Sequence, residues 1–165
     1  MSLRRFRSDT AGAVAAEMAL MTPMLLVLMF AGFEAGHYFW SEHKAIEGVR
    51  AGVRYAERLP MTTVCPATGS VDPAVLTNIR NMARTGKLAT NASPLVPGWT
   101  DGQVTVTISC GTYLSTGIYT TLGGQGATVT VASNGLVYPS IFNSLGVITT
   151  DYHLNAWSSG AVIGI

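Results

Sequence analysis

The chain has 165 residues, of which 48% are hydrophobic and only 12% are charged, enough apolar material for one modest domain with an apolar extension. Its formal net charge is +1, with Arg4, Arg5 and Arg7 crowded at the start and few charges after Arg58. A surface so poor in lysine and arginine cannot neutralise a run of phosphates, which argues against a nucleic-acid partner. It also leaves little repulsion between copies of the chain, which favours self-association.

An apolar segment follows the basic start. Every residue from 18 to 33 is uncharged, and Tyr38, Phe39 and Trp40 come shortly after it. Extended to residues 13–40, the segment is long enough to cross a bilayer core of about 30 Å, with its aromatic residues at the interface. By the positive-inside rule, the three arginines keep the N-terminus in the cytoplasm and the C-terminal part is exported.

A cleaved secretory signal or a plain signal anchor would share these features. Residues 30–37 hold no pair of small residues at the spacing that signal peptidase requires, which argues against cleavage there. A signal anchor stays open as an interpretation.

Neither alternative explains Glu17, which lies near the start of the apolar segment. An acidic side chain deep in a membrane helix costs about 2.5–3.5 kcal/mol, so it usually has a partner. If the chain were cut between Gly12 and Ala13, the new α-amino group would lie four residues before Glu17, on the same helical face. That amine can pair with Glu17 of its own chain or of a neighbouring subunit, which would set the register between two helices.

The helix is expected to continue beyond the membrane. Apolar residues recur at intervals of three and four through residues 41–58, His43/Glu47 and Glu47/Arg50 can pair across a turn, and Pro60 ends the pattern. A helix over residues 13–58 would be about 70 Å long, so its second half must pack against a soluble domain or another subunit. Within the membrane part, Pro23 predicts a kink.

Four glycines on this helix form two pairs with a spacing of four residues: Gly32 with Gly36, and Gly48 with Gly52. Small residues at this spacing let helices approach closely. We therefore expect Gly32 and Gly36 to contact another subunit. For Gly48 and Gly52 two interpretations stay open, a subunit interface or packing beneath the sheet of their own domain.

Residues 59–165 are expected to form a small exported α+β domain. Asp72 and Gly86 bracket a predicted accessory helix over residues 73–85, with a buried stripe of Val75, Leu76, Ile79 and Met82. Alternation of valine or isoleucine with threonine predicts antiparallel strands over residues 103–109 and 127–133. Residues 111–126 are long for a hairpin turn, residues 138–146 predict a helical turn, and residues 148–159 predict the closing strand.

Cys65 and Cys110 are the only cysteines. They form no cluster with the scattered histidines, so no metal site is expected. If the domain is exported, one disulfide between them is the favoured interpretation, and two free buried thiols are the alternative.

Catalytic signals are weak. The sequence has no nucleophile elbow, zinc-protease motif or phosphate-binding loop, and the glycines at 123–126 precede no lysine followed by serine or threonine. Asp151 and His153 would lie on one face of the closing strand, where a surface polar pair is the simpler interpretation. We expect neither an enzyme nor a cofactor.

The basic leader, Gly12, and Glu17 five residues later resemble the processing region of type IV prepilins, in which a membrane prepilin peptidase cuts after the glycine. "GAVAAEMALMTPMLLVLMFAGFEAG" followed by "GVRAGVRYA" is similar to TadE/TadG-like proteins of the tight-adherence pilus. The positions that carry this resemblance are Gly12, Glu17, Pro23, Glu34, Gly36 and Arg54-Tyr55-Ala56. They lie in the first third of the chain, and the rest fits the family only in general character.

The resemblance implies a minor pilin or pseudopilin that takes part in pilus assembly and surface adhesion. Residues 1–12 would be a leader removed by prepilin peptidase, and residues 13–58 would be the long helix, anchored in the inner membrane and its lipid. Its other partners would be pilin and pseudopilin subunits and the inner-membrane assembly platform, with the C-terminal domain in the periplasm or carried into an extracellular pilus. The alternatives are a periplasmic ligand-binding or enzymatic domain for which residues 1–40 are only a tether, and a toxin or adhesin carried on the pilus.

Overall fold

The computed structural model describes residues 10–67, 69–111, 126–146 and 151–164. The chain forms two compact units, residues 1–37 and residues 38–165, which we call the N-terminal unit and the C-terminal unit. The predicted α+β class is confirmed: a long first helix is followed by a small antiparallel sheet and a further helix. The predicted excursion over residues 111–126 lies almost wholly outside the described residues.

The long helix, α2, runs over Thr10–Glu57, close to the predicted 13–58. In the C-terminal unit its buried hydrophobic residues are Ala45, Val49, Val53 and Ala56, which repeat at three and four residues and so form one apolar stripe. After α2 the chain forms a short helix, α3 (Met61–Val64), that the sequence analysis did not predict. Val64 of α3 is fully buried.

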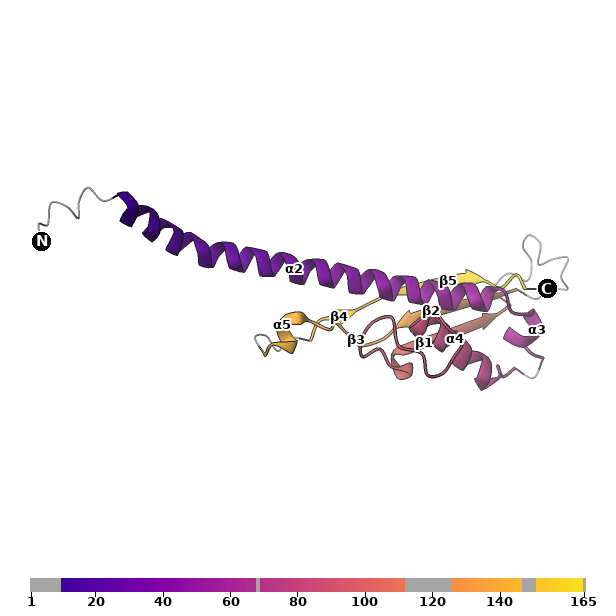
Figure 1. Ribbon diagram of the computed structural model, residues 1–165. Coiled ribbons are helices and arrows are strands. Elements are labelled where there is room, and N and C mark those ends of the chain that lie inside the picture. The colour runs from indigo at the N-terminus through magenta and orange to yellow at the C-terminus, as the bar shows by residue number, and fades with distance from the viewer. Residues whose placement is uncertain (1–9, 68, 112–125, 147–150, 165) are drawn as a thin grey trace, which may run out of the picture. The chain divides into compact units, whose positions relative to one another are not determined.

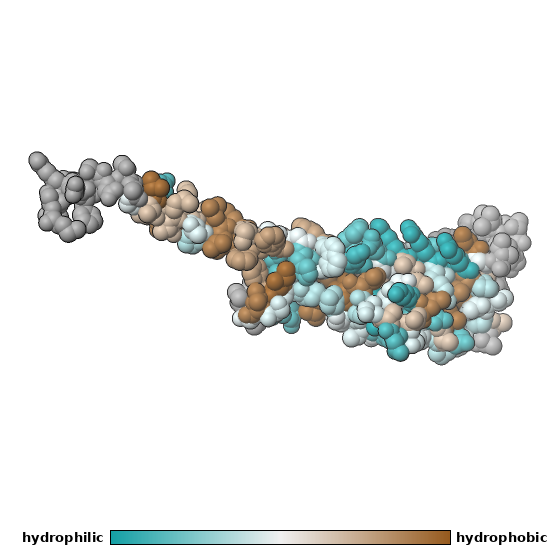
Figure 2. Space-filling model, in the orientation of Figure 1, coloured by the Kyte–Doolittle hydropathy of each residue, from teal (hydrophilic) through white to brown (hydrophobic). Residues whose placement is uncertain are grey.

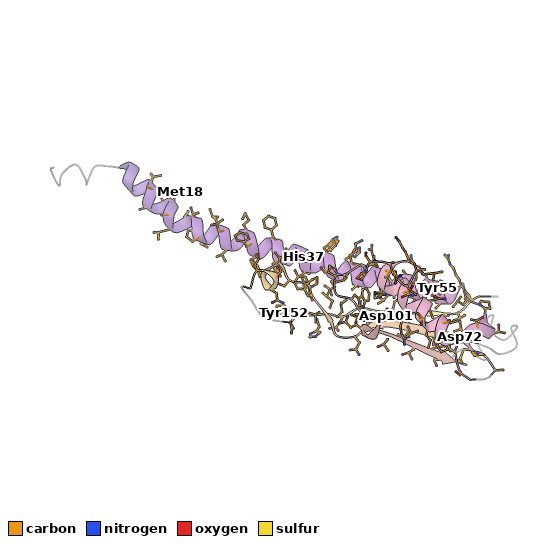
Figure 3. The ribbon with its side chains drawn as sticks, turned by 60° about the horizontal axis from the view of Figure 1, so that its bottom comes forward. Met18, His37, Tyr55, Asp72, Asp101 and Tyr152 are labelled. Atoms are coloured by element: carbon orange, nitrogen blue, oxygen red, sulfur yellow. A yellow bond between two sulfur atoms is a disulfide. The ribbon has the colours of Figure 1, made fainter. Side chains whose placement is uncertain are left out.

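Helix α4 covers Pro73–Thr85, as predicted. The Asp72 carboxylate accepts a hydrogen bond from the Ala74 backbone N–H (2.8 Å), and Gly86 ends the helix in the left-handed conformation with φ 69°. Figure 3 labels Asp72 at the start of this helix. Both ends are therefore fixed by local chemistry that can be recognised in the sequence.

The predicted buried stripe of α4 was partly wrong. Ile79 is buried, but Val75, Leu76 and Met82 are only half-buried, and the other buried positions are Asn81, Ala83 and Thr85. The reason is that α4 is covered on two sides. Ile79 and Ala83 lie against α2, and a loop folds back over the end of α4, where the Leu95 N–H donates to the Arg84 carbonyl (2.8 Å).

The main sheet contains β1 (Val104–Cys110), β2 (Ala127–Ser133) and β5 (Trp157–Ala161) in the order β1-β2-β5, all antiparallel. A turn of 3-10 helix, η1 (Asp101–Gln103), leads into β1. Val129 and Val131 of β2 are fully buried on the inner face. Helix α4 contacts β1, and Gly160 of β5 lies against Val53 and Glu57 of α2. Figure 1 shows the second half of α2 running along this sheet.

The predicted closing strand over residues 148–159 was wrong in detail. The described part of this segment contains two strands in two different sheets: β4 (His153–Leu154) pairs with β3 (Leu136–Val137), and β5 pairs with β2. The interruption between β4 and β5 lies at Ala156, whose N–H donates a hydrogen bond to the Ser133 hydroxyl oxygen (2.8 Å). The predicted helical turn is present as α5 (Ile141–Ser144), with Ser140 as its N-cap.

Candidate functional site

The first half of α2, up to Phe33, is the candidate membrane part of this helix. Side chains from Gly12 to Phe33 are all exposed, and α2 contains a stretch that is long and apolar enough to cross a membrane. In Figure 3 the labelled Met18 side chain projects from the helix with nothing packed against it, and Figure 2 shows hydrophobic residues along this part. A helix that is apolar on all sides requires an apolar environment, which a bilayer or a bundle of like helices supplies.

The predicted cleavage point lies inside α2. The helix begins at Thr10, so the Gly12–Ala13 peptide bond falls in its first turn. A Cβ atom added at Gly12 would meet nothing within 4 Å. Among the described residues, therefore, no neighbouring group obstructs access to this bond from the side of Gly12.

Glu17 is exposed on the apolar segment. Among the described residues no basic side chain forms an ion pair with it; the pairs found there lie further along the chain. Ala13 and Glu17 are one helical turn apart, so the two residues share a face of α2. In the uncut chain the Ala13 nitrogen is a neutral amide, and only cleavage would make it a cation.

Pro23 lies within α2 and does not end it. The proline has no N–H to donate to the carbonyl four residues earlier. In the same turn the Thr22 hydroxyl donates to the Met18 carbonyl oxygen (2.6 Å), the kind of side-chain bond that often accompanies a bend in a membrane helix. This turn is therefore held by one backbone hydrogen bond fewer than its neighbours.

The four predicted packing glycines divide into two groups. A Cβ atom at Gly32 or Gly36 would meet nothing within 4 Å, so both leave space for another helix. Gly48 and Gly52 are covered by α4: a Cβ atom at Gly48 would overlap the Ala83 carbonyl oxygen, and one at Gly52 would lie 2.9 Å from the Ala83 Cβ. The second pair therefore packs within its own domain, beneath α4 rather than beneath the sheet.

Cys65 and Cys110 form a disulfide with a Cα–Cα distance of 5.9 Å. Cys65 follows α3, and Cys110 is the last residue of β1. The bond therefore ties the segment after the long helix to one edge of the sheet.

The outer face of α2 in the C-terminal unit is polar, and Figure 2 shows hydrophilic residues along it. Glu47 pairs with Lys44 (3.1 Å) and with His43 (3.2 Å), whereas Arg50, its other predicted partner, forms no ion pair with a described residue. The hydrogen bond from Lys44 and the Lys44 charge lower the pKa of the Glu47 carboxyl, with a smaller contribution from His43. These exposed pairs contribute little to stability.

The Asp151 and His153 pair does not have the predicted arrangement. Only His153 lies in a strand, β4, and Asp151 precedes it; both residues are exposed.

Sequence reasoning missed a second apolar surface, formed by the segment that carries α5. Its most exposed hydrophobic residues are Leu145 and Tyr152, at 69% and 60% exposure, followed by Ile141 at 41%. The signal that was available is the absence of any charged residue from 102 to 150.

Residues 12–54 match the family model described as TadE-like protein. The match covers about a quarter of the chain and contains every residue discussed above on the membrane part of α2. The match supports the interpretation of this chain as a component associated with a tight-adherence pilus. No curated protein and no solved structure matched the chain.

Proposed function

We propose that this chain, whose residues 12–54 are TadE-like, is a minor pilin or pseudopilin that enters a tight-adherence pilus or the complex that initiates it. The observation that carries the proposal is the combination on α2 of an exposed apolar helix, an exposed Glu17 and the Gly12–Ala13 bond one turn before it. The chain would work by assembly: its helix binds other pilin helices while the C-terminal unit stays outside the cytoplasm.

In this proposal prepilin peptidase cuts after Gly12. Cleavage removes the basic start and creates an α-amino cation on Ala13, beside Glu17. In an apolar environment each of these charges is costly alone, so an amine and a carboxylate on adjacent helices attract strongly once water is excluded. The pair would fix the axial position of one subunit relative to the next, because no other described charge lies between Ala13 and Phe33.

The proposal is tested by the N-terminal sequence and intact mass of the protein recovered from membranes of cells with and without the prepilin peptidase. We expect the chain to start at Ala13 in the first strain and to keep its leader in the second. A Gly12→Leu variant should also keep the leader, since the peptidase would meet a bulky side chain before the cut. The same N-terminus in both strains would contradict the processing step and favour a tethered periplasmic domain.

Glu17 gives a second prediction. We expect Glu17→Ala to lower the amount of the protein that co-purifies with sheared pili by more than about tenfold, because loss of one partner from a buried charge pair costs roughly 2–5 kcal/mol. Membrane insertion and cleavage after Gly12 should be retained. The measurement is an immunoblot of the pilus and membrane fractions.

The matched control is Glu42→Gln, which removes another carboxylate of α2 from the C-terminal unit. It should incorporate like the natural chain. Equal losses in the two variants would show that a charge at position 17 has no special role in assembly.

A further inference from the structure

The α5 lobe, residues 136–146 together with 151–154, is a small excursion of the C-terminal unit. Leu136, Leu154 and Tyr138 are buried and form its interior. The Tyr138 N–H donates to the Tyr152 carbonyl (2.7 Å), which closes the lobe at its base. Figure 3 labels Tyr152 on this lobe, and Figure 2 shows hydrophobic surface over the region of α5.

The position of the lobe along the chain is fixed by an aromatic contact. The ring of Tyr138 packs edge-on against the ring of Tyr38, with centroids 5.1 Å apart and planes at 74°. Tyr38 is the first residue of the C-terminal unit and follows the apolar segment directly. Ile141 comes three residues after Tyr138, a span of at most about 11 Å. The lobe therefore lies at the end of the C-terminal unit where α2 enters it.

The same end of the unit exposes further aromatic side chains. Phe39 is 67% exposed and Trp40 is 51% exposed. Tryptophan after a membrane-spanning segment is typical of the bilayer interface, where its apolar ring lies among lipid and its N–H can meet water, and the Phe39 ring adds apolar surface there.

The chemistry of the lobe fits a lipid surface. Its tip, from Ile141 to Gly146, contains apolar side chains with serine and asparagine and no charge. Asp151 and His153 are exposed on the returning segment. A patch that docks a charged protein partner would be expected to present complementary charges. An uncharged apolar tip beside interfacial aromatic residues is suited to the boundary between lipid headgroups and acyl chains.

We propose that the α5 lobe rests on the surface of the membrane that α2 crosses, with Leu145 and Tyr152 among the lipid headgroups. The lobe acts as a second, interfacial contact that holds the C-terminal unit against the bilayer while the subunit waits to assemble. The inference rests on the proposed function in one respect, because it requires the N-terminal segment to be a membrane anchor.

The test uses the full chain in phosphatidylcholine vesicles. The native cysteines are bonded to each other, so a single introduced cysteine is the reactive thiol for an environment-sensitive fluorophore. The lobe is labelled through Leu145→Cys and the membrane part through Val27→Cys. Quenching by phosphatidylcholine that carries a nitroxide near the headgroup reports contact of position 145 with the lipid surface, and a nitroxide on the acyl chain reports burial of position 27 in the bilayer core.

Ile163→Cys is the matched control. Ile163 is a hydrophobic residue of similar exposure, 59%, and its N–H donates to the Glu57 carbonyl (3.0 Å). Glu57 is 19 residues after Tyr38 on α2, or about 29 Å along the helix, so Ile163 lies at the opposite end of the C-terminal unit.

We expect the label at position 145 to be quenched several-fold more than the label at position 163, at every ratio of protein to lipid. Equal quenching at 145 and 163, with strong quenching at 27, would overturn the lobe contact and leave the anchor intact. No quenching at any of the three positions would overturn the anchor as well. A change of the 145 signal only at high protein density, without lipid quenching, would mean that another copy of the chain covers the lobe, which also overturns the lipid contact.

Discussion

The double variant Cys65→Ser, Cys110→Ser is expected to lose about 4 kcal/mol of the free energy of unfolding. The two cysteines are 45 residues apart in the sequence, and in the chain-entropy model a closed loop of this length restricts the unfolded chain by that amount. The effect is a large fraction of the stability of a small domain. Guanidinium unfolding of the full chain in detergent measures it, followed by tryptophan fluorescence, in which the buried Trp99 reports the loss of the core.

The matched control is chemical reduction. Dithiothreitol should shift the natural chain to the midpoint of the double variant and should leave the double variant unchanged. A double variant within about 1 kcal/mol of the natural chain would mean that the unfolded state already keeps the two segments close, so that the bond restricts little.

Much of the fold follows from local patterns. Asp72 and Gly86 define both ends of α4 because each satisfies backbone groups of the helix by itself. Strand β2 could be predicted to the residue, since alternating valine and threonine fits a sheet with one buried face. Such features depend on residues close in sequence.

The wrong predictions concern segments whose structure depends on contacts with residues distant in the sequence. The hydroxyl of Ser133 redirects the closing segment at Ala156, and a lone serine in a strand gives no warning of that contact. The buried face of α4 was misjudged because a helix covered on two sides has no single apolar stripe. The exposed lobe around α5 was missed because short apolar runs look alike whether they end in a core or on a surface.

The assignment of Gly12, Ala13 and Glu17 to the candidate site stays a prediction, and it depends only on local helix geometry. Ala13, the residue after Gly12, and Glu17 are four residues apart, so a helix places them on one face whatever the rest of the chain does. The division of the glycines could not be predicted. Spacing is the same for Gly32/Gly36 and Gly48/Gly52, and only the position of α4 shows which pair has room for another helix.

Gly48→Ala is expected to lower the free energy of unfolding by about 1–3 kcal/mol, the usual cost of overpacking. In an open helix the same substitution would stabilise by about 1 kcal/mol, because alanine is the better helix former. At Gly48 the added methyl overlaps the Ala83 carbonyl oxygen and touches the Trp99 ring, and a backbone carbonyl in a capped helix cannot move away cheaply. Guanidinium unfolding of the full chain measures the change. Gly102→Ala is the control, since its Cβ would meet nothing within 4 Å, and it should leave the midpoint nearly unchanged.

Gly52 separates the two interpretations of these glycines further. Its added methyl would meet the Ala83 side chain at 2.9 Å, so Gly52→Ala should be partly rescued by Ala83→Gly, whereas Gly48→Ala should not be. If instead the pair formed a subunit interface, both alanine variants would keep the stability of the isolated chain and lose only incorporation into pili. Rescue of Gly52→Ala alone would place the second half of α2 in the core of its own domain. Contacts with other subunits would then be made by Gly32, Gly36 and the exposed apolar part of the helix.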